Sequence, residues 1–332
     1  MNYIFLIVGF ILLVKGADIF VDGSSSIAKI LKIPPIIIGL TIVAFGTSAP
    51  EAAVSITASI NGQNGMAIGN VIGSNIFNLL MVVGASGFIS TLLVKKSILS
   101  RELPFVLITS LLLIILSTDM FITNSSSYTL SRIDGAILLL LFAGFLYYLI
   151  SSALKSRNSS LDIDETSLDI EVIDRDVIVQ QKSSPMSKSI FLSVVGILAI
   201  ILGGKIVVDC ASDIASSFGV SDQLIGLTVV AIGTSLPEFV TSIVAATKGE
   251  SDLALGNVIG SNIFNILFVL GISALISPMT VDPKLFIDGV VMIIATIITS
   301  FFAFRKNNIN KYESLTLMIL YVAYMAYLIM TA

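Results

Sequence analysis

The chain of 332 residues contains one long segment twice. Residues 39–84 and 226–271 align without gaps at an offset of 187, and 28 of the 46 aligned positions are identical. Self-similarity of this kind indicates two related structural units that pack against each other. We therefore predict two related halves, residues 1–153 and 189–332, joined by a linker at 154–188.

Long apolar segments fill both halves. Apolar residues make up 55% of the chain and charged residues only 12%, whereas soluble domains carry about 25% charged residues. The apolar segments approach the roughly 20 residues that a helix needs to cross a bilayer. This pattern excludes an ordinary soluble enzyme and predicts an all-α polytopic membrane protein embedded in the lipid bilayer. Ten membrane-spanning helices are expected, at 3–22, 34–60, 66–89, 103–118, 131–153, 189–208, 222–247, 253–276, 284–304 and 313–331.

Five spans in each half are an odd number, so the second half enters the membrane from the opposite side. This is the inverted repeat of secondary transporters. With the N-terminus outside, fourteen Lys and Arg residues fall in cytoplasmic loops and two in outer loops, which agrees with the positive-inside rule. We expect a monomeric, multi-pass protein of the plasma membrane, with both termini outside and the linker 154–188 in the cytoplasm.

Cysteine and histidine are scarce. Cys210 is the only cysteine and the chain has no histidine, which excludes an intramolecular disulfide and the thiolate and imidazole ligands of zinc sites. A metal ion would need oxygen ligands. No permanently bound cofactor is expected, and no basic patch indicates nucleic-acid binding. The acidic linker predicts a flexible tether; calcium sensing is a weaker alternative, because the spacing of an EF-hand loop is absent.

Each half places a glutamate near the middle of its second span. The two strings read Ala44-Phe45-Gly46-Thr47-Ser48-Ala49-Pro50-Glu51 and Ala231-Ile232-Gly233-Thr234-Ser235-Leu236-Pro237-Glu238. Proline leaves the carbonyl four residues earlier without its donor, so Pro50 and Pro237 predict broken helices with freed backbone oxygens.

The two glutamates are costly in this position, because an acidic side chain at the centre of a span costs about 2.5–3.5 kcal/mol on insertion scales. Glu51 and Glu238 must therefore face a cation, water or a partner. Two alternatives stay open: protonated acids bonded to Ser and Thr hydroxyls, and pairing with Lys15 or Lys205.

The third span of each half supplies hydroxyl and amide oxygens. Residues 69–78 and 256–265 share the pattern Gly-Asn-x-x-Gly-Ser-Asn-x-x-Asn, in which the serine and the last asparagine share a helix face. Two carboxylates can neutralise one Ca²⁺ or be shared among Na⁺ ions, and a site that accepts either ion but not both performs antiport. The candidate ligands are Glu51, Glu238, Thr47, Thr234, Ser48, Ser235, Ser74, Ser261, Asn78, Asn265 and the carbonyl oxygens of Ala44 and Ala231.

The duplicated Gly-Thr-Ser-x-Pro-Glu and Gly-Asn-x-x-Gly-Ser-Asn strings closely resemble the two alpha-repeats of the sodium/calcium exchanger branch of the calcium/cation antiporter superfamily. The resemblance implies that Na⁺ enters as Ca²⁺ leaves, while spans one and six slide against the other eight. It implies that Glu51 and Glu238 bind both ions. The hydroxyls and the Ala44 and Ala231 carbonyls would form flanking sodium sites, and Asn78 and Asn265 would line the middle of the cluster.

One position departs from part of the superfamily. The potassium-dependent exchangers rely on an acid at the position of Asn265, so the resemblance implies exchange that is independent of K⁺. The glutamate that related proton/calcium exchangers carry in the helices equivalent to spans three and eight is also absent. Proton coupling through Glu51 or Glu238 stays open as the main alternative. A passive channel is less favoured, because an inverted repeat provides two exchangeable gate states, and no nucleophile or histidine accompanies the acids to suggest an enzyme.

Overall fold

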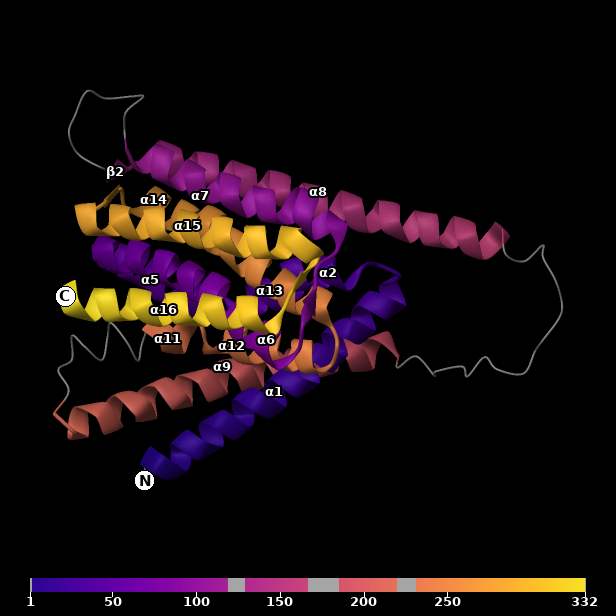
Figure 1. Cartoon of the computed structure of the whole chain (residues 1–332), viewed down its shortest axis with the longest axis horizontal. Helices are drawn as coiled ribbons and strands as arrows, with labels where there is room; N and C mark the ends of the chain where they lie inside the picture. The colour runs from indigo at the N-terminus through magenta and orange to yellow at the C-terminus, as the bar shows by residue number, and fades with distance from the viewer. Residues whose placement is uncertain (1, 119–128, 167–184, 220–230, 332) are drawn as a thin grey trace.

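The protein is an all-α membrane protein, as predicted (Figure 1). Within the described residues, eight helices are long and apolar enough to cross a membrane, and the bent pair Pro35–Thr47 and Ala49–Ile60 makes a ninth span. Part of the span expected at 222–247 falls outside these residues. The computed structural model describes the backbone of residues 2–118, 129–166, 185–219 and 231–331.

The elements of the first half are α1 (Asn2–Leu31), α2 (Pro35–Ile38), η1 (Gly39–Val43), α3 (Ala44–Thr47), α4 (Ala49–Ile60), α5 (Asn64–Phe77), η2 (Asn78–Val82), α6 (Val83–Ile89), β1 (Leu92–Leu93), η3 (Ile98–Glu102), α7 (Leu103–Ser117), β2 (Thr129–Leu130) and α8 (Arg132–Thr166). Those of the second half are α9 (Met186–Ser217), α11 (Ala231–Thr234), α12 (Leu236–Thr247), α13 (Ser251–Phe264), η6 (Asn265–Val269), α14 (Leu270–Ile276), β3 (Met279–Thr280), α15 (Pro283–Lys306), β4 (Asn308–Ile309) and α16 (Lys311–Thr331). The segments η1, η2, η3 and η6 are π-helical.

The second span is interrupted at Ser48, as its sequence predicts. Ser48 has φ −83° and ψ 7°, and the helices on either side of it are bent by 51°. Pro50 stands in the first turn of α4, where a missing N–H costs little because that group has no partner within the helix. The second half repeats the interruption at Ser235, which lies between α11 and α12 with φ −89° and ψ 5°.

The sequence repeat is also a repeat of structure. Every described element from α3 to β1 reappears 187 residues later with matching bounds, so that α4 corresponds to α12, α5 to α13, η2 to η6 and α6 to α14. In both copies a π-helical segment begins at the asparagine that ends the third-span motif, Asn78 or Asn265. Such segments are rare and often occur at functional sites.

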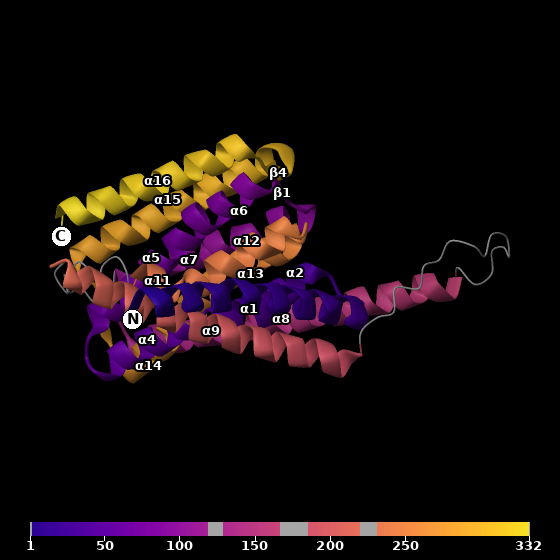
Figure 2. The same cartoon turned by 90° about the horizontal axis from the view of Figure 1, so that it is seen from below.

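Helices α1 and α9 form a close pair along one side of the bundle (Figures 1 and 2). Glycines spaced seven residues apart lie on their seam: a Cβ added at Gly16 would stand 2.9 Å from the Ala199 Cβ and 3.0 Å from the Gly196 carbonyl oxygen. A Cβ added at Gly9 would stand 3.1 Å from the carbonyl oxygen of Gly203. Residues later in α1 pack against residues earlier in α9, so the two helices are antiparallel.

Three helices run further than the sequence predicts. One is α9, expected to end at 208, which continues to Ser217. The span expected at 3–22 continues to Leu31, and it ends only where Lys32 adopts a φ of 56° ahead of two prolines. Helix α8 continues to Thr166, so the first part of the expected tether extends a helix. Residues 167–184 of that tether lie outside the described part of the chain.

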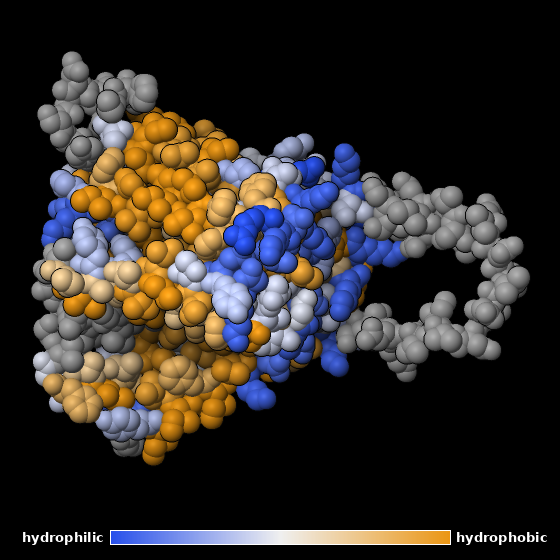
Figure 3. Space-filling view, in the orientation of Figure 1, coloured by the Kyte–Doolittle hydropathy of each residue, from blue (hydrophilic) through white to orange (hydrophobic). Residues whose placement is uncertain are grey.

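The surface carries a broad hydrophobic belt (Figure 3). Side chains within it are apolar and open, such as Leu140, which is 73% exposed. Hydrophilic residues gather at the end of the bundle from which α8 projects (Figures 1 and 3). The start of α1 and the end of α16 both lie at the opposite end (Figure 1). This distribution is typical of a protein that is surrounded by lipid.

Ion pairs at the hydrophilic end join α1 to the loop after α12. The Lys248 Nζ lies 2.7 Å from Asp18 Oδ1 and 2.7 Å from Asp22 Oδ1, and Ser25 donates to Glu250 at 2.6 Å. Burial lowers the pKa of Lys248, but the hydrogen bonds with Asp18 and Asp22 outweigh this effect and raise the pKa above its usual value. We call these five residues the Lys248 cluster. It borders a polar cleft of about 390 Å³.

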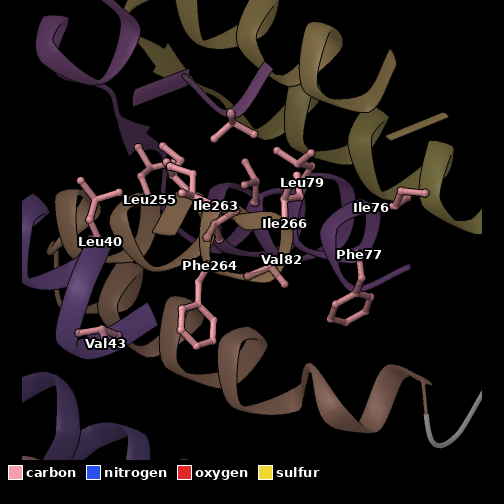
Figure 4. Packing of buried hydrophobic residues seen from close by; sticks show 14 of the residues in the cluster. Leu40, Val43, Ile76, Phe77, Leu79, Val82, Leu255, Ile263, Phe264 and Ile266 are labelled. Atoms are coloured by element: carbon pink, nitrogen blue, oxygen red, sulfur yellow. The ribbon is translucent and has the colours of Figure 1, made fainter. Parts of the chain in front are cut away.

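Buried apolar side chains pack around the two repeat motifs and form a frame (Figure 4). Leu40, Ile263 and Phe264 are among the buried side chains that fill the space between the motifs. A Cβ added at Gly260 would stand 2.7 Å from the Ala44 Cβ, so glycine is needed for this close approach of α13 to α3. The polar groups described next are held by this frame.

Candidate ion-binding site

Glu51 and Glu238 lie in the first turns of α4 and α12, and both are 0% exposed. Each acid accepts a hydrogen bond from a serine of the other half. The Ser235 hydroxyl donates to Glu51 Oε1 at 2.9 Å, and the Ser48 hydroxyl donates to Glu238 Oε1 at 2.7 Å. The predicted acids and serines of the two halves are therefore brought into one cluster.

Ser48 and Ser235 occupy the N-cap positions of α4 and α12. A serine at this position usually accepts a hydrogen bond from an amide of the first helical turn, but neither side chain makes such a bond. Their hydroxyls reach across to the opposite acid instead. The free amides at each helix start carry partial positive charge, which favours a carboxylate or another anion in the first turn.

The serines of the third spans join the same cluster. The hydroxyls of Ser235 and Ser74 lie 3.0 Å apart, and the Ser261 hydroxyl lies 3.4 Å from Glu238 Oε1. Both serines are predicted ligands; the structure places Ser261 beside Glu238 and joins Ser74 to Glu51 through the Ser235 hydroxyl.

Thr47 and Thr234 contact the third spans through asparagines that were not predicted as site residues. The Thr47 hydroxyl lies 3.0 Å from Asn257 Oδ1, and the Thr234 hydroxyl lies 3.5 Å from Asn70 Oδ1. The amide nitrogen of Asn257 donates at 3.4 Å to the carbonyl oxygen of Glu238. Asn70 does the same at 3.4 Å to the carbonyl oxygen of Glu51. These two asparagines fix the backbone at each acid.

Two serines that are not among the predicted ligands accept hydrogen bonds from these asparagines. Asn70 donates to Ser55 at 2.9 Å, and Asn257 donates to Ser242 at 2.9 Å. Each serine follows its glutamate by four residues and so lies on the same helix face. That spacing, present in both copies, is the signal that could have identified them.

Asn78 and Asn265 lie one helical turn beyond Ser74 and Ser261, on the same faces of their helices. Both are 0% exposed. The amide nitrogen of Asn78 donates to Asn262 Oδ1 at 3.1 Å, and that of Asn265 donates to Asn75 Oδ1 at 3.2 Å. The Oδ1 atoms of Asn78 and Asn265 both lack a hydrogen-bond partner.

The predicted backbone ligands differ between the halves. The Ala44 carbonyl is not freed, because it accepts the Ser48 amide at 2.9 Å and lies 3.3 Å from the Thr47 hydroxyl. In the second half the Ser235 amide instead donates to Ile232, at 3.2 Å. The Ala44 oxygen is therefore not freed from its helical hydrogen bond, and its role as an ion ligand stays a prediction, because such an oxygen keeps a second lone pair. Ala231 begins α11.

The charge of the acids has no basic partner among the described residues. None of the ion pairs in that part of the chain involves Glu51 or Glu238, and Lys15 and Lys205 are exposed on α1 and α9. The Oε2 atoms of both acids are buried without a hydrogen-bond partner. A protonated Oε2 would be a buried donor with no acceptor, which is unfavourable. The Oε2 atoms are therefore the carboxylate oxygens left available to a cation.

The predicted ligands thus include four buried oxygens without hydrogen-bond partners, two from carboxylates and two from amides. Oxygen ligands of this kind suit hard cations such as Ca²⁺. The candidate ligands whose side chains the structure describes are at most 7% exposed. Within the described part of the chain, these side chains are therefore almost fully shielded from solvent.

Residues 1–151 and 188–330 match the family described as sodium/calcium exchanger protein. The sodium/calcium exchanger MaX1 of Methanosarcina acetivorans is 34% identical over 348 residues, covering 98% of this chain and 98% of MaX1. The inner membrane protein YrbG of Escherichia coli is 37% identical over 307 residues, covering 91% of this chain and 88% of YrbG. A solved structure of the sodium-calcium exchanger NCX_Mj superimposes with a TM-score of 0.79 and 31% identity, covering 98% of both chains.

Proposed function

Because the chain belongs to the sodium/calcium exchanger protein family and is therefore a cation/calcium antiporter, we propose that it exchanges Na⁺ for Ca²⁺ across the plasma membrane. Na⁺ enters the cell and Ca²⁺ leaves it, by alternating access. Both ions are transported substrates, and no permanent cofactor takes part.

One observation carries this proposal: Glu51 and Glu238 are fully buried and have no basic partner among the described residues. Two carboxylates balance the charge of one Ca²⁺ or of two Na⁺ ions. Binding both kinds of ion at once would leave uncompensated positive charge in a region of low dielectric, which is unfavourable. The same oxygens therefore serve the two ions in alternation.

The other predicted ligands divide by their place around the acids. The Ca²⁺ ion lies between Glu51 and Glu238, with Asn78 and Asn265 at the middle of the cluster. The flanking Na⁺ ions are held by the hydroxyls of the remaining ligands and by two carbonyl oxygens: Thr47, Ser48, Ser74 and Ala44 in one set, and Thr234, Ser235, Ser261 and Ala231 in the other.

Alternating access rests on ten spans arranged as two inverted halves, residues 1–153 and 189–332. The antiparallel pairing of the equivalent helices α1 and α9 supports the inversion. The shared position of the chain ends, opposite the end from which α8 projects (Figure 1), supports a topology with both termini outside and the linker in the cytoplasm. The α1–α9 pair moves against the other spans to open the site to either side.

Exchange is independent of K⁺ in this proposal. Asn78 and Asn265 are both neutral amides, so the site carries two negative charges from Glu51 and Glu238 and lacks a third. A further monovalent cation would therefore find no charge to balance it.

Radioactive calcium uptake into proteoliposomes tests the proposal. Vesicles loaded with Na⁺ and diluted into Na⁺-free medium should accumulate Ca²⁺, whereas vesicles with only a K⁺ or a pH gradient should not. The Glu51→Gln/Glu238→Gln double variant gives the background. Accumulation driven by a pH gradient without Na⁺ would replace the proposal with proton coupling, and uptake that merely equilibrates without any gradient would indicate a channel.

A further inference from the structure

Four asparagines on the two third spans are linked to one another by hydrogen bonds. Asn75 donates to the backbone carbonyl of Asn262 at 3.3 Å, and Asn262 donates to the backbone carbonyl of Asn75 at 3.3 Å. The side-chain oxygens of the same two residues accept the amide nitrogens of Asn265 and Asn78, at 3.2 Å and 3.1 Å. We call these four residues the asparagine ring.

We propose that Asn75 and Asn262 are positioning residues that fix which end of the Asn265 and Asn78 amides faces the transported cation. This inference rests on the proposed function, because it takes Asn78 and Asn265 to lie beside the cation. Neither Asn75 nor Asn262 needs to touch the ion.

The orientation follows from the two backbone carbonyls. A carbonyl oxygen only accepts hydrogen bonds, so the end of the Asn75 side chain that meets the Asn262 carbonyl must be the NH₂ group. The other end of Asn75 is then an oxygen, and the group of Asn265 that meets it must be NH₂. The Asn265 oxygen is left pointing elsewhere, and it is buried without a partner. The same chain of steps runs from the Asn75 carbonyl through Asn262 to Asn78.

An amide turned by 180° would have two unfavourable consequences. Its oxygen would meet the oxygen of Asn75 or Asn262, leaving two buried acceptors face to face. Its NH₂ group would be directed at the cation, where an electron-pair donor is required. The ring therefore selects the oxygen of each amide as the ligand before any ion arrives.

The ring also explains why neutral amides suffice at these positions. A carboxylate has two equivalent oxygens and needs no such orientation, whereas an amide is a useful ligand only in one of its two orientations. Outer groups that orient a metal ligand typically change metal affinity by about 10–100-fold when they are removed.

A double-mutant cycle tests the proposal. Asn75→Leu removes the acceptor that holds the Asn265 amide, and it should weaken equilibrium Ca²⁺ binding in detergent by about tenfold or more, within the range for orienting groups. In the Asn265→Asp background the same Asn75→Leu change should not weaken binding, because the carboxylate has no wrong end and one of its oxygens would otherwise meet the Asn75 oxygen. Equal losses in both backgrounds would show a merely structural role for Asn75, and no loss in either would show that Asn265 is oriented by something else.

Matched control variants separate the loss of orientation from a general loss of stability. Thr299→Val removes another buried hydrogen bond to the same region, from Thr299 to the Leu79 carbonyl at 3.3 Å, and it should leave Ca²⁺ binding unchanged. The symmetry-related cycle, Asn262→Leu with Asn78→Asp, should behave in the same way. If the leucine variants do not fold, Asn75→Ser removes the amide acceptor with a smaller change of polarity, and it should show the same dependence on residue 265.

The cycle measures binding alone, so its outcome is separate from that of the flux experiment. A parent protein that binds Ca²⁺ but does not accumulate it in exchange for Na⁺ would overturn the proposed function. The double-mutant cycle would still test whether Asn75 orients Asn265.

Discussion

At the scale of single residues, the two buried glutamates determine the charge of the site. Glu51→Gln or Glu238→Gln keeps the size of the side chain but leaves one negative charge against a divalent ion, in a region where charge is poorly screened. We expect either variant to lose calcium exchange, measured as Na⁺-driven calcium uptake into proteoliposomes.

Glu102→Gln is the matched control for these variants. Glu102 is also a buried acid, only 6% exposed, and its Oε2 has no hydrogen-bond partner, but it lies in η3, outside the cluster. Its replacement should leave uptake close to that of the parent. Normal uptake in Glu51→Gln or Glu238→Gln would remove these residues from the site.

Asn265 sets a second test at this scale. Asn265→Asp adds a third carboxylate to the cluster, and like charges held close together disfavour ionisation of one another. The variant should therefore bind an extra cation or a proton, and its calcium uptake should come to depend on K⁺ or on pH, while uptake by the parent is independent of K⁺. Flux against K⁺ and pH for both proteins checks this. A parent that K⁺ stimulates would refute the charge argument, and an unchanged variant would place Asn265 outside the ion cluster.

The acids and most hydroxyl ligands can be predicted from the sequence, because a charged or polar group within an apolar span demands an explanation on its own. The supporting residues cannot be predicted in this way. Asn70, Asn75, Asn257 and Asn262 act through partners on other helices, and for Asn75 and Asn262 those partners lie nearly 190 residues away. The Ala44 carbonyl, expected to be free, keeps the ordinary helical hydrogen bond from the Ser48 amide, because the carbonyl four residues before Pro50 is that of Gly46.

At the scale of elements, the glycine seam between α1 and α9 makes a quantitative test possible. Gly16→Ala places a Cβ 2.9 Å from both the Ala199 Cβ and the Ile200 backbone nitrogen, so the helices must separate. Overpacking of this kind costs roughly 1–3 kcal/mol. We expect lower thermal stability in detergent for Gly16→Ala.

Gly144→Ala provides the comparison, because a Cβ at Gly144 of α8 meets no described atom within 4 Å. There the change removes a glycine from a helix interior, which favours the helix by up to about 1 kcal/mol. The two alanine variants should therefore shift the melting temperature in opposite directions. A neutral Gly16→Ala would show that α1 and α9 can separate at this seam without loss of stability.

The sequence predicts the spans and the break at Ser48, because both depend on local composition and on proline. It does not predict the π-helical segments, the short strand pairs or the end of α8. The strands β1 and β4 pair across more than 200 residues, and no local pattern marks them. The extension of α8 to Thr166 crosses a change from apolar to polar composition, which predicts an earlier end of the helix.

At the scale of the whole molecule, the linker between the halves is expected to act only as a tether. Replacing residues 167–184 with a Gly/Ser segment of equal length should leave the rate and calcium dependence of exchange within about two- to threefold of the parent, because flexible linkers substitute well for one another. A shift in calcium activation of about tenfold or more would instead identify a calcium sensor. Flux measured over a range of calcium concentrations separates the two outcomes.

The Lys248 cluster has no equivalent at the symmetry-related place, between α9 and the loop after α4. At the 187-residue offset Asn61 stands in place of Lys248, and Lys205 in place of Asp18. If the two inverted halves made equal contacts, the ion site would be open to each side of the membrane for the same fraction of time. Exposed ion pairs contribute about 0.2–1 kcal/mol each, so the two pairs to Lys248 favour the arrangement that contains them by roughly fivefold, as a bias of about 1 kcal/mol implies. The carrier should therefore rectify: its apparent calcium affinities at the two membrane faces should differ by a similar factor, and Lys248→Asn should make them more nearly equal.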